Sequence, residues 1–470
     1  MGCNKSLPVQ VQARVTSQSE VYRRRPVQKK TSLITKEMGS LSNHFEILSA
    51  MGSTSTGTLL YARDLRSGTL RTIREVCKTI TSDYSSLFLE VTILSELDHP
   101  NILKVYQTIE TNRSYYIVME SADGGNIQDR ILKSGNEYLV SKFMHDVFSA
   151  INYMHIKGII HCDLHIGNLL LSNQTSDAIP KITGFSSSQK SSDIQEIDLA
   201  LLNYQYISPD MLDGTVNEKT DIWSLGIILY KLLVGKLPFV SKNKKEILEA
   251  IYKGDLDFED PNFVSLSHNA KDFLQKLLVR ECFSRLSAKD ALNHVWLQQS
   301  IKDVGLTYQI VQKLRRFKMK TSVVRSVLSF LNFKLDFKEH EIIGLFKKMD
   351  VNHDGNIGKA EMIDSFKSIG IDCANEMDSI MNNLDMDQSG SLDFTELKIV
   401  LINWDKEIKK KLLGKVFEAN DGAIDYEAFK HQLHDILPSE WTEFAKRLRV
   451  ENNRISLPRL KEYLKTNIVF

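Results

Sequence analysis

The chain has 470 residues, which is too long for a single hydrophobic core, so we expect two to four domains. Hydrophobic residues make up 42% and charged residues 25%, as in ordinary soluble globular proteins. A formal net charge of +1 argues against nucleic acid as a partner. The five cysteines have no paired spacing, which predicts a reducing cytoplasmic compartment, and no apolar run is long enough to span a bilayer.

Residues 1–43 read as a basic segment that we expect to be disordered. The start of the chain fits the N-myristoylation pattern, with Gly2 as the acceptor, and Cys3 is a candidate for palmitoylation. The first 40 residues hold eight Lys or Arg against two Glu. One acyl chain anchors weakly, and a second chain or a polybasic segment makes attachment stable. The sequence therefore predicts a cytoplasmic protein held peripherally at a membrane; the alternative is an unmodified basic tail.

Residues 44–122 have the pattern of a small, strand-rich lobe. Short apolar runs separated by turn residues over 44–70 predict paired strands. The segment Gly52–Gly57 joins two runs and approaches the pattern G-x-G-x-x-G, whose backbone closes over phosphate groups. Thr54 replaces the middle glycine and hinders close approach to phosphate. Gly52 and Gly57 are candidate nucleotide-binding residues, with an ordinary hairpin as the alternative.

The rest of this lobe carries a candidate ion pair and a candidate hinge. Arg74 follows Thr72 and Ile73 on an expected third strand, and Ser86–Leu97 has helical apolar spacing with Glu90 on it. These residues resemble the strand-three lysine and the helix glutamate of protein kinases, and the resemblance implies an ion pair between Arg74 and Glu90. The strand Tyr116–Glu120 resembles the kinase strand that enters the hinge, and the resemblance makes Met119, Glu120 and Ala122 candidate nucleotide-binding residues.

Residues 123–297 carry the motifs of a second, helical lobe. In chain order these are His161-Cys162-Asp163-Leu164-His165-Ile166-Gly167-Asn168, Gly184-Phe185-Ser186, Tyr206-Ile207-Ser208-Pro209-Asp210 and Asp221-Ile222-Trp223-Ser224-Leu225-Gly226. Their order and spacing resemble the catalytic loop H-R-D-L-x-x-x-N, D-F-G, A-P-E and the central helix of protein kinases. The resemblance implies a bilobal α+β kinase fold over 44–297, with Asp163 at the position of the catalytic base, Met119 as gatekeeper and Arg285 paired with Asp210.

Several positions depart from the kinase pattern where phosphate and metal would bind. Gly184 stands where an aspartate would hold Mg²⁺, Arg74 where a lysine would contact phosphates, and His165 where a lysine would steady the transferred group. Asn168 remains, but magnesium is usually bound through one or two carboxylates. ATP therefore stays a candidate ligand, whereas the residues argue against Mg²⁺.

The size of the expected loss in reaction rate favours an inactive catalytic centre. Loss of one preorganised charge-stabilising donor costs about 10²–10³ in rate, and loss of the metal removes several further kcal/mol. Asn203 also replaces a threonine that would bond Asp163. We therefore expect a pseudokinase. The alternative is a slow kinase with displaced metal ligands, for which Asp177 is a candidate.

Two 12-residue loops in the last third carry oxygen-bearing side chains at alternating positions. The ligand positions are Asp350, Asn352, Asp354, Asn356 and Glu361 in the first loop, and Asp385, Asp387, Ser389, Ser391 and Glu396 in the second. A glycine at position 6 allows the sharp turn, and the final glutamate binds Ca²⁺ in bidentate fashion. We expect two EF-hand Ca²⁺ sites. The second is expected to bind more tightly, because Asp393 brings it to four acidic residues against three.

Two further hands have lost their ligands. The third has Phe417, Ala419 and Ala428 at positions 1, 3 and 12, and the fourth ends with Arg459 where glutamate belongs. Residues 341–467 therefore read as an all-α, calmodulin-like domain of four EF-hands, the first two intact. We expect its first half to be the calcium sensor and its second half a fixed docking element.

Residues 298–340 form a junction between the two regions. Basic and apolar residues alternate along 304–334, which predicts a basic amphipathic helix of the type that EF-hand lobes wrap. An ordinary linker helix is the alternative.

The order of these parts resembles the calcium-dependent protein kinase family over residues 44–467. The family implies a Ser/Thr kinase that transfers the ATP γ-phosphate to protein substrates and is blocked by its junction until calcium moves the EF-hand lobes. This chain departs at Thr54, Arg74, Cys162, His165, Gly184 and two EF-hands. We therefore expect a membrane-associated, calcium-switched binding module. An active kinase and an ATP-binding sensor are the alternatives.

Overall fold

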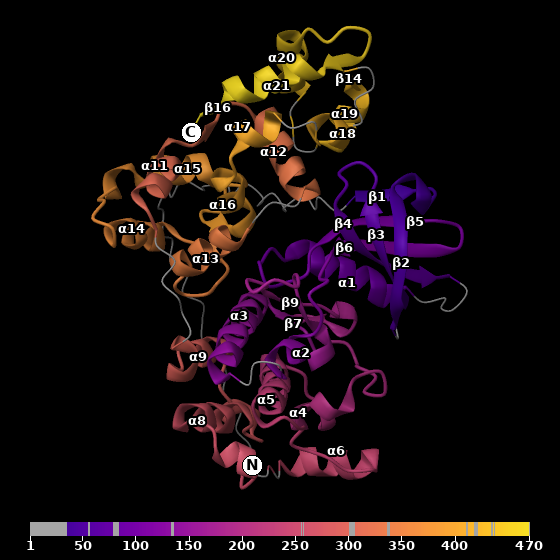
Figure 1. Cartoon of the computed structure of the whole chain (residues 1–470), viewed down its shortest axis with the longest axis vertical. Coiled ribbons are helices and arrows are strands. Elements are labelled where there is room, and N and C mark those ends of the chain that lie inside the picture. Colours follow the sequence, from indigo (N-terminus) through magenta and orange to yellow (C-terminus); the bar gives the residue numbers. More distant parts are fainter. Residues whose placement is uncertain are drawn as a thin grey trace, which may run out of the picture.

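The computed structural model describes residues 35–54, 57–78, 84–132, 136–254, 256, 258–299, 306–335, 339–409, 412–417, 422–433, 436 and 438–469. Figure 1 shows a strand-rich lobe, a helical lobe and a second helical region that lies against both of them. The predicted bilobal α+β fold followed by an all-α EF-hand region is confirmed. The acylation candidates Gly2 and Cys3 lie outside the described residues.

The first lobe is a six-stranded sheet. Its strands are β1 (Thr35–Met38), β2 (Phe45–Thr54), β3 (Gly57–Asp64), β4 (Leu70–Cys77), β5 (Val105–Glu110) and β6 (Ser114–Glu120), in the order β1-β5-β6-β4-β3-β2. All neighbours are antiparallel except β1 and β5. Helix α1 (Ser85–Glu96) packs beside the sheet, as its apolar spacing predicts (Figure 1).

The start of this lobe differs from the prediction. The expectation of disorder through residue 43 is wrong for Thr35–Asn43, because Thr35–Met38 pairs with β5 and a 3₁₀ turn, η1 (Leu41–Asn43), follows it. An added strand at an open sheet edge depends on a partner about 70 residues later in the chain. Local sequence pattern therefore gave no sign of it.

The second lobe is built on two long helices. Its helices are α2 (Ile127–Leu132), α3 (Glu137–Ile156), α4 (Pro209–Leu212), α5 (Glu218–Val234), α6 (Lys244–Lys253), α7 (Pro261–Val264), α8 (His268–Leu277), α9 (Ala288–Leu292) and α10 (Val295–Gln298). Short strands β7 (Ile159–Ile160), β8 (Leu169–Leu171), β9 (Pro180–Ile182) and β10 (Gln189–Lys190) carry the catalytic-loop region. Asn217 begins α5 with a capping box and Gly235, with φ +88°, ends it. Arg285 pairs with Asp210 at 2.9 Å, both buried, as predicted.

The junction is not the single helix that 304–334 predicted. It forms α11 (Tyr308–Arg316), strand β11 (Lys318–Met319) and α12 (Ser322–Lys334), whereas 304 and 305 lie outside the described residues. Strand β11 pairs with β16 (Ile468–Val469) at the C-terminus, and Thr321 caps α12 by accepting a hydrogen bond from Val324 N. The break therefore exchanges helical hydrogen bonds for a strand contact with a distant segment.

The EF-hand region and the junction share one hydrophobic core. Its elements are α13 (His340–Met349), β12 (Asn356–Ile357), α14 (Lys359–Lys367), α15 (Met377–Leu384), β13 (Leu392–Asp393), α16 (Phe394–Leu401), α17 (Trp404–Lys409), α18 (Leu412–Val416), β14 (Ala423–Asp425), α19 (Tyr426–Gln432), α20 (Pro438–Leu448), β15 (Arg454–Ser456) and α21 (Leu457–Asn467). Val311, Leu314 and Phe317 of the junction are fully buried in this core. Within the described part of the chain, no helix has the length and apolarity needed to cross a bilayer.

Candidate functional site

Arg74 is tied to Glu90 beneath the strand-rich lobe. Strand β4 and helix α1 place the guanidinium Nη2 2.5 Å from Glu90 Oε2, and both side chains are buried. The predicted pairing is present. An arginine in this arrangement keeps α1 against the sheet, while its planar, forked head differs from the compact ammonium of a lysine that would contact phosphate.

The position of the missing metal carboxylate is filled by a neighbouring amide. Gly184 adopts φ +83°, and a Cβ built on it would lie 2.4–2.5 Å from the side-chain amide atoms of Asn168. That amide donates a hydrogen bond to the backbone oxygen of Asp163 at 2.8 Å. Among the described residues, no cluster of three His, Cys, Asp or Glu ligands forms near Gly184, so the donor set does not fit Mg²⁺. The Asp177 carboxylate accepts the Thr175 hydroxyl.

The catalytic-loop framework survives around Asp163. Asp221 of α5 accepts hydrogen bonds from the backbone N–H groups of His161 (2.9 Å) and Cys162 (3.0 Å), and Cys162 has φ +68°. One Asp163 carboxylate oxygen accepts from Asn203 N at 3.4 Å, so the backbone replaces the hydroxyl that a threonine would offer. The other lies 3.9 Å from His165 Nε2.

The neighbours of Asp163 supply little positive charge. Burial lowers the pKa of His165, which favours its neutral form. Burial, with Asp221 and Asp163 nearby, raises the pKa of the Cys162 thiol. The loop therefore keeps its shape while His165 and Cys162 add no positive charge beside Asp163.

The candidate nucleotide residues come together at the hinge and the strand-rich lobe. Met119 and Ala122 are buried at the end of β6, and Glu120 pairs with Lys181 of β9 at 2.6 Å, a contact that sequence reasoning missed. Gly57 has φ +141°, and a Cβ there would meet Glu75 O at 2.3 Å, so this turn requires glycine. Gly52 also has a positive φ. The side chain of Thr54 lies outside the described residues.

The second calcium loop gathers its carboxylates. Oxygens of Asp385, Asp387 and Glu396 all lie within 4.8 Å of one another. Glu396 Oε1 accepts from Met386 N and Asp387 N, and its Oε2 accepts from Asp393 N. Burial, followed by repulsion from Asp393, raises the pKa of Glu396 to about 9. Crowded, buried oxygen ligands of this kind fit Ca²⁺, whose charge would relieve the repulsion.

The first calcium loop has the same framework. Asp350 accepts from Asp354 N (3.1 Å) and Gly355 N (3.0 Å), while Glu361 accepts from three backbone N–H groups, at Val351, Asn352 and Gly358. Burial and then the Asp354 charge raise the pKa of Asp350 to about 8. Strands β12 and β13 pair the two loops, with Asn356 opposite Asp393 and Ile357 opposite Leu392. In the second loop, the hydroxyl of Ser389 donates a hydrogen bond to the backbone oxygen of Ser391, and both residues stand at ligand positions.

The two strands in the region of the predicted degenerate hands pair with each other. Strands β14 and β15 pair, and Asn453, at position 6 of the fourth loop with φ +58°, donates to Asp425 Oδ2 at 2.8 Å and accepts from Glu427 N. The guanidinium of Arg459 donates to the Leu448 and Arg449 carbonyls at 3.4 Å. Side-chain hydrogen bonds thus hold this pair of loops; Ala419 lies outside the described residues.

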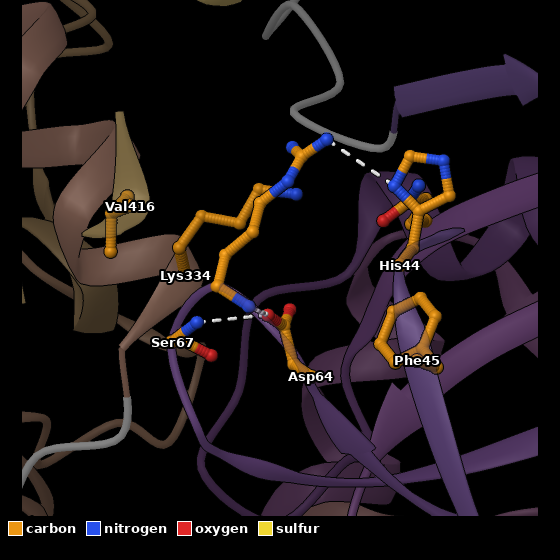
Figure 2. Close-up of a pocket in the computed structure, with 8 residues that line it drawn as sticks. His44, Phe45, Asp64, Ser67, Lys334 and Val416 are labelled. Carbon is orange, nitrogen blue, oxygen red and sulfur yellow. Dashed lines mark hydrogen bonds between the residues drawn. The ribbon is translucent and has the colours of Figure 1, made fainter. Parts of the chain in front are cut away.

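The junction contacts the strand-rich lobe through the end of α12. Arg71 Nη2 donates to Lys334 O at 3.1 Å, and the rings of Tyr106 and Phe333 meet at 5.0 Å. Figure 2 shows a cavity of about 10 Å³ at this seam, lined by residues of the lobe together with Lys334 and Val416. It has room for a single water and not for a nucleotide.

Comparisons with known proteins agree with this architecture. Residues 45–297 match the protein kinase domain family, and residues 339–402 match the EF-hand domain pair, which covers the two intact loops. The class is therefore a protein kinase fold joined to an EF-hand pair.

Curated relatives are similar along most of the chain. Calcium-dependent protein kinase 4 of Plasmodium falciparum is 31% identical over 406 residues, covering 81% of this chain and 77% of the relative. Calcium-dependent protein kinase 5 of the same species is 28% identical, covering 84% and 79%, and calcium-dependent protein kinase 3 of Plasmodium berghei is 27% identical, covering 82% and 72%. The chain belongs to the calcium-dependent protein kinase family.

Proposed function

We propose that this member of the family is a membrane-attached calcium switch that binds partner proteins and does not transfer phosphate. The observation that carries the proposal is the arrangement at Gly184, where the Asn168 amide occupies the space beside a position that lacks a carboxylate. Without that carboxylate, Mg²⁺ loses its main protein ligand and the phosphates lose the charge that steadies them. The proposed units are 1–43, a kinase-like domain at 44–297 (lobes 44–122 and 123–297), a junction at 298–340 and a calmodulin-like domain at 341–467.

The retained framework suits a binding role. Arg74 and Glu90 keep α1 in place, and Phe185 is fully buried against His161, with ring centres 4.8 Å apart. A kinase-like domain held in a defined shape presents a defined surface to a partner. ATP without Mg²⁺ remains a candidate ligand at Gly52, Gly57, Met119, Glu120 and Ala122.

Calcium would act through the two intact loops. Asp350, Asn352, Asp354, Asn356 and Glu361 would hold one ion, and Asp385, Asp387, Ser389, Ser391 and Glu396 the other. A bound ion neutralises the repelling carboxylates, which changes how the EF-hand lobes hold α11 and α12. Acylation at Gly2 and Cys3 would place this switch at a membrane, where the basic segment 1–43 adds attraction to anionic lipids.

The second candidate function is a slow calcium-dependent Ser/Thr kinase. It is favoured by the retention of Asp163 and Asn168 in a hydrogen-bonded loop. This reading requires a different route to charge neutralisation, since Gly184 offers no carboxylate to hold Mg²⁺.

One assay separates the two functions. The full-length chain is incubated with γ-labelled ATP, Mg²⁺ and a mixture of basic and acidic protein substrates, with Ca²⁺ or with a chelator, beside the Asp163→Ala variant. We expect transfer by the wild-type chain to equal that of the variant in both conditions. Calcium-stimulated transfer that disappears in Asp163→Ala would establish the kinase instead.

A further inference from the structure

We propose that the kinase-like domain carries a receptor for both calcium loops, formed by Asp98, Asn152 and Tyr153, and that this receptor tightens their calcium binding. The inference rests on the part of the proposed function that assigns Ca²⁺ to the two intact loops. It adds that the affinity of those loops is set partly by the domain they regulate.

The first loop sits directly on helix α3. Asn152 Nδ2 donates to the backbone oxygen of His353 at 2.6 Å, and a Cβ on Gly355 would lie 2.1 Å from Tyr153 Cδ2. Asn152 and Tyr153 are nearly fully buried. Position 6 of this loop is therefore glycine for two reasons, its φ of +79° and the ring that faces it.

An ion pair reinforces this contact one turn away. Lys347, at the end of α13 just before the loop, lies 2.7 Å from Asp146 Oδ1, and both side chains are largely buried. The rings of His145 and His353 meet edge to face with centres 5.2 Å apart. The kinase-like domain thus holds both the end of α13 and His353, on the N-terminal side of the tight turn at Gly355.

The second loop is held at the start of its exit helix. Asp98 accepts from Thr395 N at 3.0 Å and from Thr395 Oγ1 at 2.9 Å. Thr395 immediately precedes Glu396, the bidentate position, and lies in the first turn of α16. A carboxylate there satisfies an N–H that has no partner within the helix and is favoured by the helix dipole.

The two contacts form one unit. Tyr153 OH accepts a hydrogen bond from Asp98 N at 2.8 Å, so the residue facing the first loop also fixes the residue that holds the second. Asp98 follows α1, which ends at Glu96 and carries Glu90. Figure 1 shows α13 and α16 in the part of the EF-hand region that lies toward α3. Calcium loops, α3 and the end of α1 are therefore joined by direct hydrogen bonds.

The direction of the effect follows from the geometry. In the docked arrangement, Asp98 fixes Thr395, the residue next to the ligand Glu396, and Asn152 fixes the backbone of His353 within the first loop. Docking thus removes part of the ordering cost that calcium binding would otherwise carry. Because coupling is reciprocal, calcium must tighten docking by the factor with which docking tightens calcium binding.

The test measures calcium affinity one loop at a time by calorimetry of the full-length chain. The Glu361→Gln background leaves the second loop, and the Glu396→Gln background leaves the first. In the former, we expect Asp98→Ala to weaken calcium binding about 5- to 50-fold. In the latter, we expect Asn152→Ala to weaken it about 2- to 10-fold, since one neutral hydrogen bond is lost.

Matched controls exclude a general loss of stability. Asp213→Ala, the control for Asp98→Ala, removes an exposed carboxylate after α4. Tyr138→Phe, the control for Tyr153→Phe, removes a hydroxyl from the far end of α3. Both controls should keep wild-type affinity. If Asp98→Ala melts early, Asp98→Asn provides the folded comparison, with a smaller weakening expected because the charge alone is lost.

The possible outcomes distinguish the receptor proposal from the proposed calcium switch. Wild-type calcium binding with affinities unchanged within twofold in every receptor variant would overturn the receptor and leave the calcium switch standing. A wild-type chain that binds no calcium at either loop would overturn both. Tighter binding in Asp98→Ala would mean that docking opposes calcium, which contradicts the proposal.

Discussion

The phosphate site of a kinase and the calcium loop of an EF-hand both need charged side chains held in place by backbone hydrogen bonds. In this chain the two regions differ in which of these features is present. The loops keep both the framework and the carboxylates, as at Glu396, which takes three backbone N–H groups. The phosphate site keeps the framework around Asp221 and Asp163 but has Gly184 and Arg74 at its charged positions. If the proposed function holds, this chain has kept the framework of the phosphate site without its chemistry.

The largest effect is expected from breaking the Arg74–Glu90 pair. If Arg74 now serves structure, Arg74→Ala leaves a buried carboxylate without its cation and lowers the free energy of unfolding by about 3–5 kcal/mol. Thermal unfolding monitored by circular dichroism measures this. The double variant Arg74→Met with Glu90→Leu is the control and should recover most of the loss. A stable Arg74→Ala variant would contradict a structural role.

Removal of the bidentate ligand should nearly abolish calcium binding at the second loop. Glu396→Gln removes one charge from a cluster of gathered carboxylates, so the affinity should fall by more than the roughly 10- to 100-fold that loss of an outer-shell partner costs. Calorimetry in the Glu361→Gln background measures it, with the exposed Glu462→Gln as control. Retained affinity would show that this loop is not the site.

The degenerate hands should be stabilised by Asn453 without calcium. Asn453→Ala loses two side-chain hydrogen bonds and places alanine at φ +58°, which together cost about 2–4 kcal/mol. Asn453→Gly keeps the backbone conformation and should cost about half as much. Melting in the presence of a chelator checks this. Equal stability of all three chains would mean that some other contact fixes these loops.

Restoring one carboxylate at the phosphate site should change activity least. Gly184→Asp must adopt a left-handed φ and displace the Asn168 amide, while Arg74 and His165 remain unsuited to phosphate. Each missing donor costs about 10²–10³ in rate, so transfer should stay at background. Magnesium-dependent transfer by this single variant, absent when Asp163→Ala is added, would show that only one group had been lost.

Sequence pattern predicted those parts of the molecule that depend on local spacing or on a family motif. The ion pairs Arg74–Glu90 and Asp210–Arg285 and the EF-hand pair at 339–402 are of this kind. The contacts that join domains, such as Asn152 with His353, link residues about 200 positions apart and leave no periodic trace.

The junction illustrates the same limit. Its amphipathic pattern is real, since Val311 and Leu314 are buried, but the helix breaks at β11 because the C-terminal strand β16 offers a partner. Local propensity could not anticipate a competing partner about 150 residues away. Strand β1 was missed for a similar reason, because its partner β5 lies in a later part of the lobe.

The central claim is that calcium acts on the junction, with no phosphate transfer needed for the response. Hydrogen exchange of α11, β11 and α12 in the full-length chain, with Ca²⁺ and with a chelator and in the absence of ATP, tests it most directly. We predict that calcium changes the exchange of 306–334 and that Glu361→Gln combined with Glu396→Gln abolishes the change. Identical exchange in both conditions, in a chain shown to bind calcium, would contradict the account.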